Sequence, residues 1–191
     1  MEHVGFSFET HFVEQHLPQD PRIEVAIAWG KKLSEKGFCP SYGKGSHGNI
    51  SFRLGEGMVI TGTQTDTGSL TSQDFVEVVG CDWTEAKPKV FCKGARIPST
   101  ETLIHFGIYQ KRPDVQAIIH AHDQEVLQRL GHTQLPITAI EEPSGSLALL
   151  HEIEKLLGHD YFIMRSHGVV ALGKTLEEAG KRLLYVHKGL R

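Results

Sequence analysis

The sequence has few cysteines and no long hydrophobic run near its start. Cys39, Cys81 and Cys92 are odd in number and lack a CxxC spacing, which argues against a disulfide framework and against a thiolate zinc site. Residues 1–20 contain neither a basic segment followed by an apolar run nor a stretch long enough to span a membrane. We therefore expect no signal peptide, no membrane association and a cytoplasmic location.

The chain also lacks an excess of basic charge. Its 20 Lys and Arg residues are balanced by 23 Asp and Glu residues, which gives a formal net charge of -3 at pH 7. This balance argues against nucleic acid as a partner. No repeat, linker or low-complexity segment divides the 191 residues, of which 39% are hydrophobic. We predict one soluble domain over residues 1–191, with residues 1–19 as an N-terminal extension.

Histidine is abundant, with 12 residues, and two of them interrupt an apolar segment. In "AIIHAHD", residues 117–123, His120 and His122 lie two apart, so in a strand they point to the same face about 6.6 Å apart. A buried imidazole without a partner costs about 1–3 kcal/mol. A divalent metal would satisfy both rings, and hydrogen bonds to the backbone are the alternative. The pair alone leaves both interpretations open.

Hydrophobic periodicity and turn residues predict one α/β domain with a mostly antiparallel sheet covered by helices. The predicted elements are a helix over 20–37, two strands around the turn 55–57, strands near 74–82 and 88–94, a helix from Ser99 to before Pro113, the histidine strand, a helix over 144–158, a strand over 161–173 interrupted near His167, and a helix over 175–188. A capping box from Thr175 to Glu178 opens the last helix.

Two further residues are candidates for the same site. His167 stands where a strand meets a glycine turn, so its side chain can leave the sheet and point into a cleft. Glu101 is expected in the first turn of its helix, where the helix dipole favours an anion. An ordinary first-turn carboxylate is the alternative for Glu101.

Four segments carry a resemblance to a known family. "GSHGNIS", "VITGT", "PSTETLIHFGIYQKRPDVQAIIHAHD" and "MRSHGVVALGKTLEEA" occur in the order found in the class II aldolase/adducin family. Its members include fuculose-phosphate aldolases, ribulose-phosphate 4-epimerases and methylthioribulose-phosphate dehydratases. The resemblance runs from about residue 20 to the C-terminus. It implies a class II aldolase-like three-layer α/β/α fold with a mostly antiparallel central sheet.

The resemblance also implies a set of site residues. Its metal-binding histidines fall on His120, His122 and His167, and its acid/base glutamate, which can also bind the metal, falls on Glu101. The implied cofactor is zinc or another divalent metal. Substrate phosphate contacts fall on Gly48, Asn49, Thr63, Gln64, Ser99 and Thr100. For Ser99 and Thr100 a position at a helix N-terminus supports anion binding. His105 fits the family pattern and is expected to pack.

The implied function is a zinc-dependent class II aldolase, a lyase acting on a small phosphorylated sugar such as a fuculose-phosphate-like ketose. A metal-dependent dehydratase or 4-epimerase of a ketopentose phosphate is the alternative within the enzymes. A non-catalytic adducin-like module is the alternative of another class, and the presence of all three histidines with Glu101 argues against it. The resemblance further implies a homo-oligomer, expected to be a tetramer.

Two positions depart from the family pattern. Gln64 stands where relatives carry glycine, which predicts a reshaped phosphate site. Relatives also place a tyrosine after the histidine strand, whereas this chain has Ile140 and Glu141 there. The second proton donor is therefore not identified. Glu141 or Glu142 can substitute, and an exposed acidic pair is the alternative.

Overall fold

A single sheet organises the chain in a computed structural model, which describes residues 7–189. Among these residues eight strands pair in the order β1-β5-β4-β3-β2-β6-β8-β7. Their bounds are β1 Glu9–Glu14, β2 Asn49–Leu54, β3 Gly57–Thr61, β4 Phe75–Asp82, β5 Lys89–Lys93, β6 Ala117–Ala121, β7 Tyr161–Met164 and β8 Gly168–Gly173. Only β1 and β5 pair in parallel, and the other neighbours are antiparallel.

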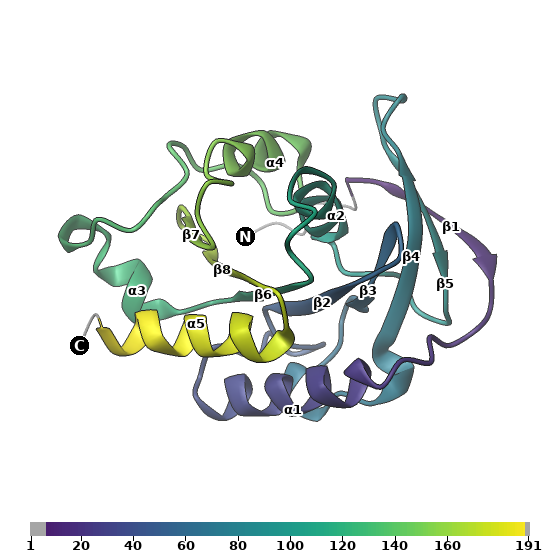
Figure 1. The fold of residues 1–191 in the computed structure, drawn as a ribbon, viewed down its shortest axis with the longest axis horizontal. Helices are drawn as coiled ribbons and strands as arrows, with labels where there is room; N and C mark the ends of the chain where they lie inside the picture. The colour runs from purple at the N-terminus through teal and green to yellow at the C-terminus, as the bar shows by residue number, and fades with distance from the viewer. Residues whose placement is uncertain (1–6, 190–191) are drawn as a thin grey trace.

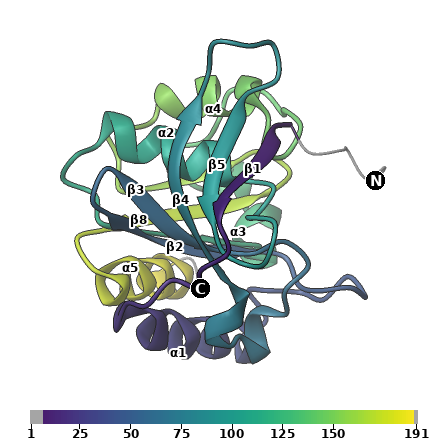
Figure 2. The same ribbon diagram turned by 90° about the vertical axis from the view of Figure 1, so that its right-hand side faces the viewer.

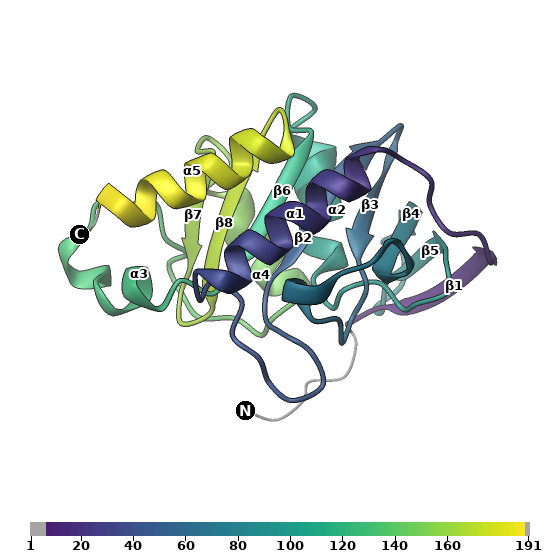
Figure 3. The same cartoon turned by 90° about the horizontal axis from the view of Figure 1, so that it is seen from below.

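Helices cover both faces of the sheet. They are α1 (Arg22–Glu35), α2 (Thr102–Lys111), α3 (Gln124–Gln128), α4 (Leu147–Glu154) and α5 (Leu176–Gly189), with short 3-10 turns at Thr67–Ser69, Ser72–Asp74 and Leu130–His132. Helices α1 and α5 lie on one face, and α2 and α4 lie on the other (Figures 1 and 2). Viewed from below, α1 and α5 both cross in front of the sheet (Figure 3). This arrangement confirms the three-layer α/β/α prediction. Within residues 7–189, no helix combines the length and apolarity that a membrane span requires.

Alternating side chains of the central strands build two hydrophobic cores. Ile118 of β6 and Val170 of β8 belong to the core under α2 and α4, and Ile119 and Ala171 belong to the core under α1 and α5. Because both faces of these strands are buried, they are apolar at nearly every position. His120 shares the face of Ile118, which points it toward the layer of α2.

Part of the predicted N-terminal extension belongs to the sheet. Strand β1 pairs with β5 at the sheet edge, and the preceding residue Phe8 is 1% exposed. No strand was predicted here, because the apolar residues Phe12 and Val13 of β1 are exposed and the segment does not alternate between apolar and polar residues. Residues 1–6 of the extension lie outside the described part. The short helix α3, capped by Asp123, was also missed.

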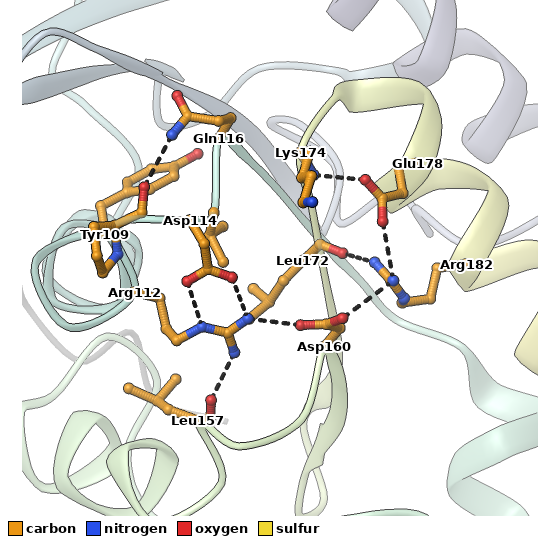
Figure 4. Close-up of polar contacts among 12 residues, drawn as sticks. Tyr109, Arg112, Asp114, Gln116, Leu157, Asp160, Leu172, Lys174, Glu178 and Arg182 are labelled. Atoms are coloured by element: carbon orange, nitrogen blue, oxygen red, sulfur yellow. Dashed lines mark hydrogen bonds and ion pairs between the residues drawn. The ribbon is translucent and has the colours of Figure 1, made fainter.

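An ion-pair network anchors the end of α2 (Figure 4). The Arg112 guanidinium donates to both carboxylate oxygens of Asp114 at 2.8 and 2.7 Å, to Asp160 at 2.8 Å and to the Leu157 carbonyl at 2.6 Å. Hydrogen bonding to Arg112 lowers the pKa of Asp114 to about 2. Asp160 also accepts from Arg182 of α5 at 3.2 Å. The network thus joins α2, the turn before β7 and α5, and it fixes the helix whose other end carries Glu101.

Packing between α1 and α5 depends on one glycine. A Cβ atom placed at Gly180 would lie 2.4 Å from the ring of Trp29, a buried residue of α1. We predict that Gly180→Ala destabilises the protein by about 1–3 kcal/mol through overpacking, which lowers Tm by roughly 2–4 °C per kcal/mol for a chain of this size. Thermal unfolding followed by circular dichroism measures the change.

The matched control is Gly189→Ala on the same helix, where a Cβ atom would meet nothing within 4 Å. This change should leave Tm unchanged or raise it slightly, since alanine is the better helix former. Equal Tm values for the two variants would contradict the close packing of Gly180 on Trp29.

Candidate active site

Three histidines from two neighbouring strands converge on one point. His120 lies in β6, His122 follows the end of β6, and His167 lies in the turn between β7 and β8. Each offers a ligand nitrogen, and these atoms all lie within 4.8 Å of one another. The ring centroids are 4.9 to 5.1 Å apart. The structure thus brings together the three histidines that the sequence analysis selected.

The β7–β8 turn delivers His167 to this point. Ser166 adopts a left-handed backbone conformation with φ 57°, and the His167 amide donates to the Met164 carbonyl at 3.1 Å. Gly168 then allows β8 to approach β6, because a Cβ atom there would lie 2.6 Å from Cε1 of His120 and 2.5 Å from the Ala121 carbonyl oxygen. Glycine at position 168 is therefore a geometric requirement of the site.

The histidines of β6 are held as neutral rings. Nδ1 of His120 lies 3.0 Å from the Val169 carbonyl, which makes it the protonated nitrogen and leaves Nε2 as an acceptor. Burial lowers the pKa of His120 to about 4, although the Glu101 charge acts in the opposite direction. Burial and the neighbouring His120 and His167 lower the pKa of His122 to about 2. Neutral imidazole is the form that binds a metal.

Glu101 is the only carboxylate among the described residues that line this cleft. It is 3% exposed, with Oε2 at 3.3 Å from Nε2 of His120 and Oε1 at 3.1 Å from Nε2 of His167. The Asn49 amide donates to Oε2 at 3.0 Å, and the Ser144 hydroxyl donates to Oε1 at 2.9 Å. Each carboxylate oxygen therefore has two polar neighbours.

These neighbours keep Glu101 ionised. Burial by itself would raise the pKa of Glu101, but the charge of His167 and the hydrogen bonds from His167 and Asn49 hold it well below its ordinary value. For His167, burial lowers the pKa and the Glu101 charge raises it, with a net upward shift. The site therefore places the ionised Glu101 carboxylate beside imidazole rings whose nitrogens can bind a metal cation.

The residues present fit a divalent metal. Three imidazoles and a carboxylate are a ligand set typical of zinc. Asn49 Oδ1 and His167 Nδ1 are buried without a hydrogen-bond partner among the described residues, as is common where an ion or ligand belongs. The Glu101 oxygens contact the Nε2 atoms of His120 and His167. A cation bound by these nitrogens would either displace the Glu101 carboxylate from them or take the carboxylate as an additional ligand.

The six predicted phosphate-binding residues line the same cleft as the histidines and Glu101. Ser99 accepts a hydrogen bond from the Glu101 amide at 3.3 Å, and the Asn49 amide is engaged with Glu101 as described. Gln64 has φ 57° and an exposed side chain. The left-handed backbone explains why glycine suits this position.

One local prediction was wrong. Helix α2 begins at Thr102 with Glu101 as its N-cap, so Ser99, Thr100 and Glu101 precede the first turn that the sequence analysis assigned to them. The cause is a separate turn, closed by the Thr102 amide donating to the Ser99 carbonyl at 3.0 Å. These residues still lie at the N-terminal end of the helix.

Sequence reasoning missed several residues that line the cleft. Tyr42, His47 and Ser144 are the three with side chains suited to chemistry, and Ser46, Gly62 and Thr65 complete the lining. The His47 ring stacks on His122 with centroids 4.4 Å apart and planes at 30°. Burial and the nearby His167 lower its pKa. His47 lies within the quoted "GSHGNIS", so the motif contained the signal, whereas Ser144 comes from a loop without periodicity.

His105 lies below the site in a buried polar chain. Its Nδ1 is 2.7 Å from the Ser51 hydroxyl, which is 2.9 Å from the Tyr109 hydroxyl. Burial lowers the pKa of His105 to about 3, so the ring is neutral. The residue joins α2 to β2 by a hydrogen bond as well as by packing.

The three-layer fold and the cluster of three histidines with a glutamate define a protein class. The family model described as "Class II Aldolase and Adducin N-terminal domain" matches residues 25–191. The chain belongs to this family.

Named relatives differ in their reactions. An L-fuculose phosphate aldolase of Methanocaldococcus jannaschii is 32% identical over 162 residues, covering 78% of this chain and 84% of its own. A methylthioribulose-1-phosphate dehydratase of Pseudoalteromonas translucida is 28% identical over 190 residues, covering 84% of each chain. Among solved structures, an L-fuculose 1-phosphate aldolase superimposes with a TM-score of 0.72 at 25% identity, covering 91% of this chain and 86% of its own.

Removal of one histidine should abolish metal binding. We predict that His122→Ala weakens the affinity for Zn²⁺ by more than about 100-fold, because even loss of a residue that only supports a ligand costs 10–100-fold. Metal content after dialysis, measured by mass spectrometry, and competition with a chelator are the readouts. His159→Ala, at an exposed turn, is the control and should bind metal as the wild type does. Equal metal content in His122→Ala and the control would rule out the site.

Proposed function

We propose that this chain is a metal-dependent class II aldolase, a lyase that cleaves or forms a carbon–carbon bond in a small phosphorylated ketose such as a fuculose-phosphate-like sugar. The observation that supports the proposal best is the geometry of the Glu101 carboxylate, which is buried and lies 3.3 Å from Nε2 of His120 and 3.1 Å from Nε2 of His167 in one cleft. A buried charge of this kind is costly and is typical of catalytic sites. The relatives named as aldolases agree with it.

His120, His122, His167 and Glu101 would hold the metal. A divalent cation such as zinc, when bound there, would polarise the carbonyl and hydroxyl oxygens of a ketose and stabilise the negative charge that develops as the bond breaks. The Val169 carbonyl holds the His120 ring with Nε2 directed at Glu101. The neutral state of His120 and His122 means that they need not lose a proton before binding.

Glu101 would act as the acid/base. In the cleavage direction a proton leaves the hydroxyl that becomes the aldehyde carbonyl, and a proton is added to the carbon of the remaining fragment. A carboxylate can accept the first proton and return a proton to carbon. The hydrogen bonds from Asn49 and Ser144 approach its two oxygens separately and so fix the plane of the carboxylate.

Neutral donors would bind the substrate phosphate. Among the described residues, the cleft lining contains no Lys or Arg. The hydroxyls of Thr63, Ser99 and Thr100, the Asn49 side chain and the backbone near Gly48 and Gln64 are the groups proposed for this role. Hydroxyl and amide groups at the end of a helix can bind a phosphate without a lysine. The Asn49 side-chain amide has two N–H groups, so one can donate to the phosphate while the other keeps its contact with Glu101.

A dehydratase of a ketopentose phosphate is the second candidate, and a 4-epimerase is a related one. The dehydratase relatives support it. The exposed Glu141, whose charge contributes to the raised pKa of His167, is a candidate second carboxylate from outside the cleft lining. Both lyase reactions generate negative charge beside the ketose carbonyl, and they differ in whether an aldehyde or water leaves. Glu141 would then protonate the leaving oxygen. The adducin-like alternative has no use for the buried Glu101.

Product analysis separates the two lyase reactions. We predict that the zinc-loaded protein joins dihydroxyacetone phosphate to a short aldehyde, giving a longer ketose phosphate detectable by NMR. A parallel incubation with methylthioribulose 1-phosphate tests for loss of water. If methylthioribulose 1-phosphate loses water and no longer ketose phosphate forms, the protein is a dehydratase and the aldolase proposal is wrong. Absence of both products would contradict the lyase proposal.

Glu101→Gln tests the acid/base role. Because the three histidines remain to hold the metal, this variant should keep metal and substrate binding, while kcat falls about 10²–10⁴-fold, the usual loss for a general acid/base. Steady-state kinetics and metal analysis are the measurements, and Glu177→Gln on exposed α5 is the control. Turnover close to the wild type would exclude the role. Concurrent loss of metal would show that Glu101 is also a ligand.

The assembly and location stay predictions. We infer a homotetramer from family membership. A cytoplasmic location and the absence of nucleic-acid and membrane partners follow from the composition of the chain.

A further inference from the structure

We propose that His47 is a substrate-binding residue of the cleft, whose ring nitrogens hydrogen-bond a hydroxyl or carbonyl oxygen of the phosphorylated ketose beside the metal position. This inference rests on the proposed function and adds a residue that determines specificity. His47 is not among the positions that the family pattern supplied.

The backbone around His47 is built to hold the ring in place. The His47 amide donates to the Pro40 carbonyl at 2.9 Å, and the Ser46 amide donates to the Thr65 carbonyl at 2.9 Å. The Ser46 hydroxyl donates to the Thr67 hydroxyl at 2.7 Å and accepts from the Thr67 amide at 2.8 Å. The loop is therefore closed on itself between Pro40 and His47, and its Ser46 end is tied to the segment that carries Thr65 and Thr67.

Gly48 brings this loop against the histidine strand. It has φ 89°, and a Cβ atom there would lie 2.9 Å from the His120 carbonyl oxygen. Only glycine combines this backbone conformation with such a close approach. As a result, His47 is brought over the end of β6, where its ring stacks on His122.

Stacking separates His47 from the metal ligands. The nitrogens that can share one ion belong to His120, His122 and His167, and His47 is outside this group. Rings at 30° and 4.4 Å lie face to face, so the His47 ring covers His122 and does not converge with it on a common point. Tyr42 packs at a tilt against the same ring, with centroids 4.9 Å apart.

The ring nitrogens of His47 are available to a ligand. No recorded hydrogen bond among the described residues uses them, and the ring lines the cleft while half-buried. By contrast, Nδ1 of His120 is engaged with Val169, and the Glu101 oxygens are engaged with Asn49 and Ser144. A ring placed beside the ligand cluster and open to the cleft is suited to contact the reacting end of a substrate.

The chemistry of the ring favours the sugar over the phosphate. A neutral imidazole offers one donor and one acceptor, which matches a hydroxyl, whereas a phosphate offers mainly acceptors. Glu101, the proposed acid/base, is close enough for its charge to act on the His47 ring, whereas Thr63 and Ser99 of the same cleft are the hydroxyls proposed for the phosphate. His47 would therefore distinguish ketoses by the oxygens near the bond that reacts.

Three substitutions of His47 separate stacking from hydrogen bonding. His47→Phe keeps a flat ring against His122 and removes both nitrogens. His47→Gln keeps a donor and an acceptor and removes the ring. His47→Ala removes both functions. His159→Phe, at an exposed turn, is the control.

The probe is dihydroxyacetone phosphate, the three-carbon fragment common to 1-phosphoketoses, titrated into zinc-loaded protein by calorimetry. His47→Phe should hold zinc as the wild type does but bind the probe about 10-fold more weakly, as expected for a lost hydrogen bond, with a matching loss in kcat/KM. His47→Gln should recover part of the probe affinity, and His47→Ala should weaken both zinc and probe binding. The His159→Phe control should equal the wild type.

Two results would overturn the inference in distinguishable ways. Wild-type affinity and kcat/KM in His47→Phe would remove His47 from substrate binding and leave the proposed function intact. A wild-type protein that binds zinc but neither binds the probe nor acts on a ketose phosphate would overturn both the inference and the proposed function.

Discussion

The Glu101 carboxylate, ionised and removed from water, is the interaction on which the site depends. Taking a carboxylate out of water costs several kcal/mol unless charges and hydrogen bonds compensate. Here the compensation comes from His167, Asn49 and Ser144, which between them contact both oxygens. A cation added between these groups satisfies the same charge. The arrangement therefore favours metal binding, and it orients a base at the metal.

The scaffold supplies these contacts from separate parts of the chain. Strand β6 lies between β2 and β8, and the register sets His120 opposite Asn49 on one side and Val170 on the other. Helix α2 brings Glu101 over the same edge, and its far end is fixed by the network around Arg112. The folded backbone therefore positions the polar groups of the site before any ligand binds, which is the condition for catalysis by preorganised charge.

The residue spacing and motifs of the sequence predicted the side chains of the site that lie within a single strand or turn. The spacing of His120 and His122 follows from strand alternation. His167 before a glycine turn and Glu101 at a helix start were further candidates, and the family resemblance assigned their roles. The edge strand β1 was not predicted, because its exposed apolar residues pack against no second layer and the strand therefore shows no alternation of apolar and polar residues. His47 and Ser144 escaped because each reaches the site through loop contacts between distant segments, which no periodicity encodes. Strand register and loop contacts arise only when the sheet is folded, so the sequence pattern alone did not predict them.

The central claim is that one divalent metal binds among the three histidines beside Glu101. Crystallographic anomalous scattering at the zinc absorption edge tests it directly on zinc-loaded protein. The account predicts one strong peak per chain at about 2.0–2.1 Å from a nitrogen of each of His120, His122 and His167. A structure without that peak, with Glu101 still paired to His120 and His167, would contradict it.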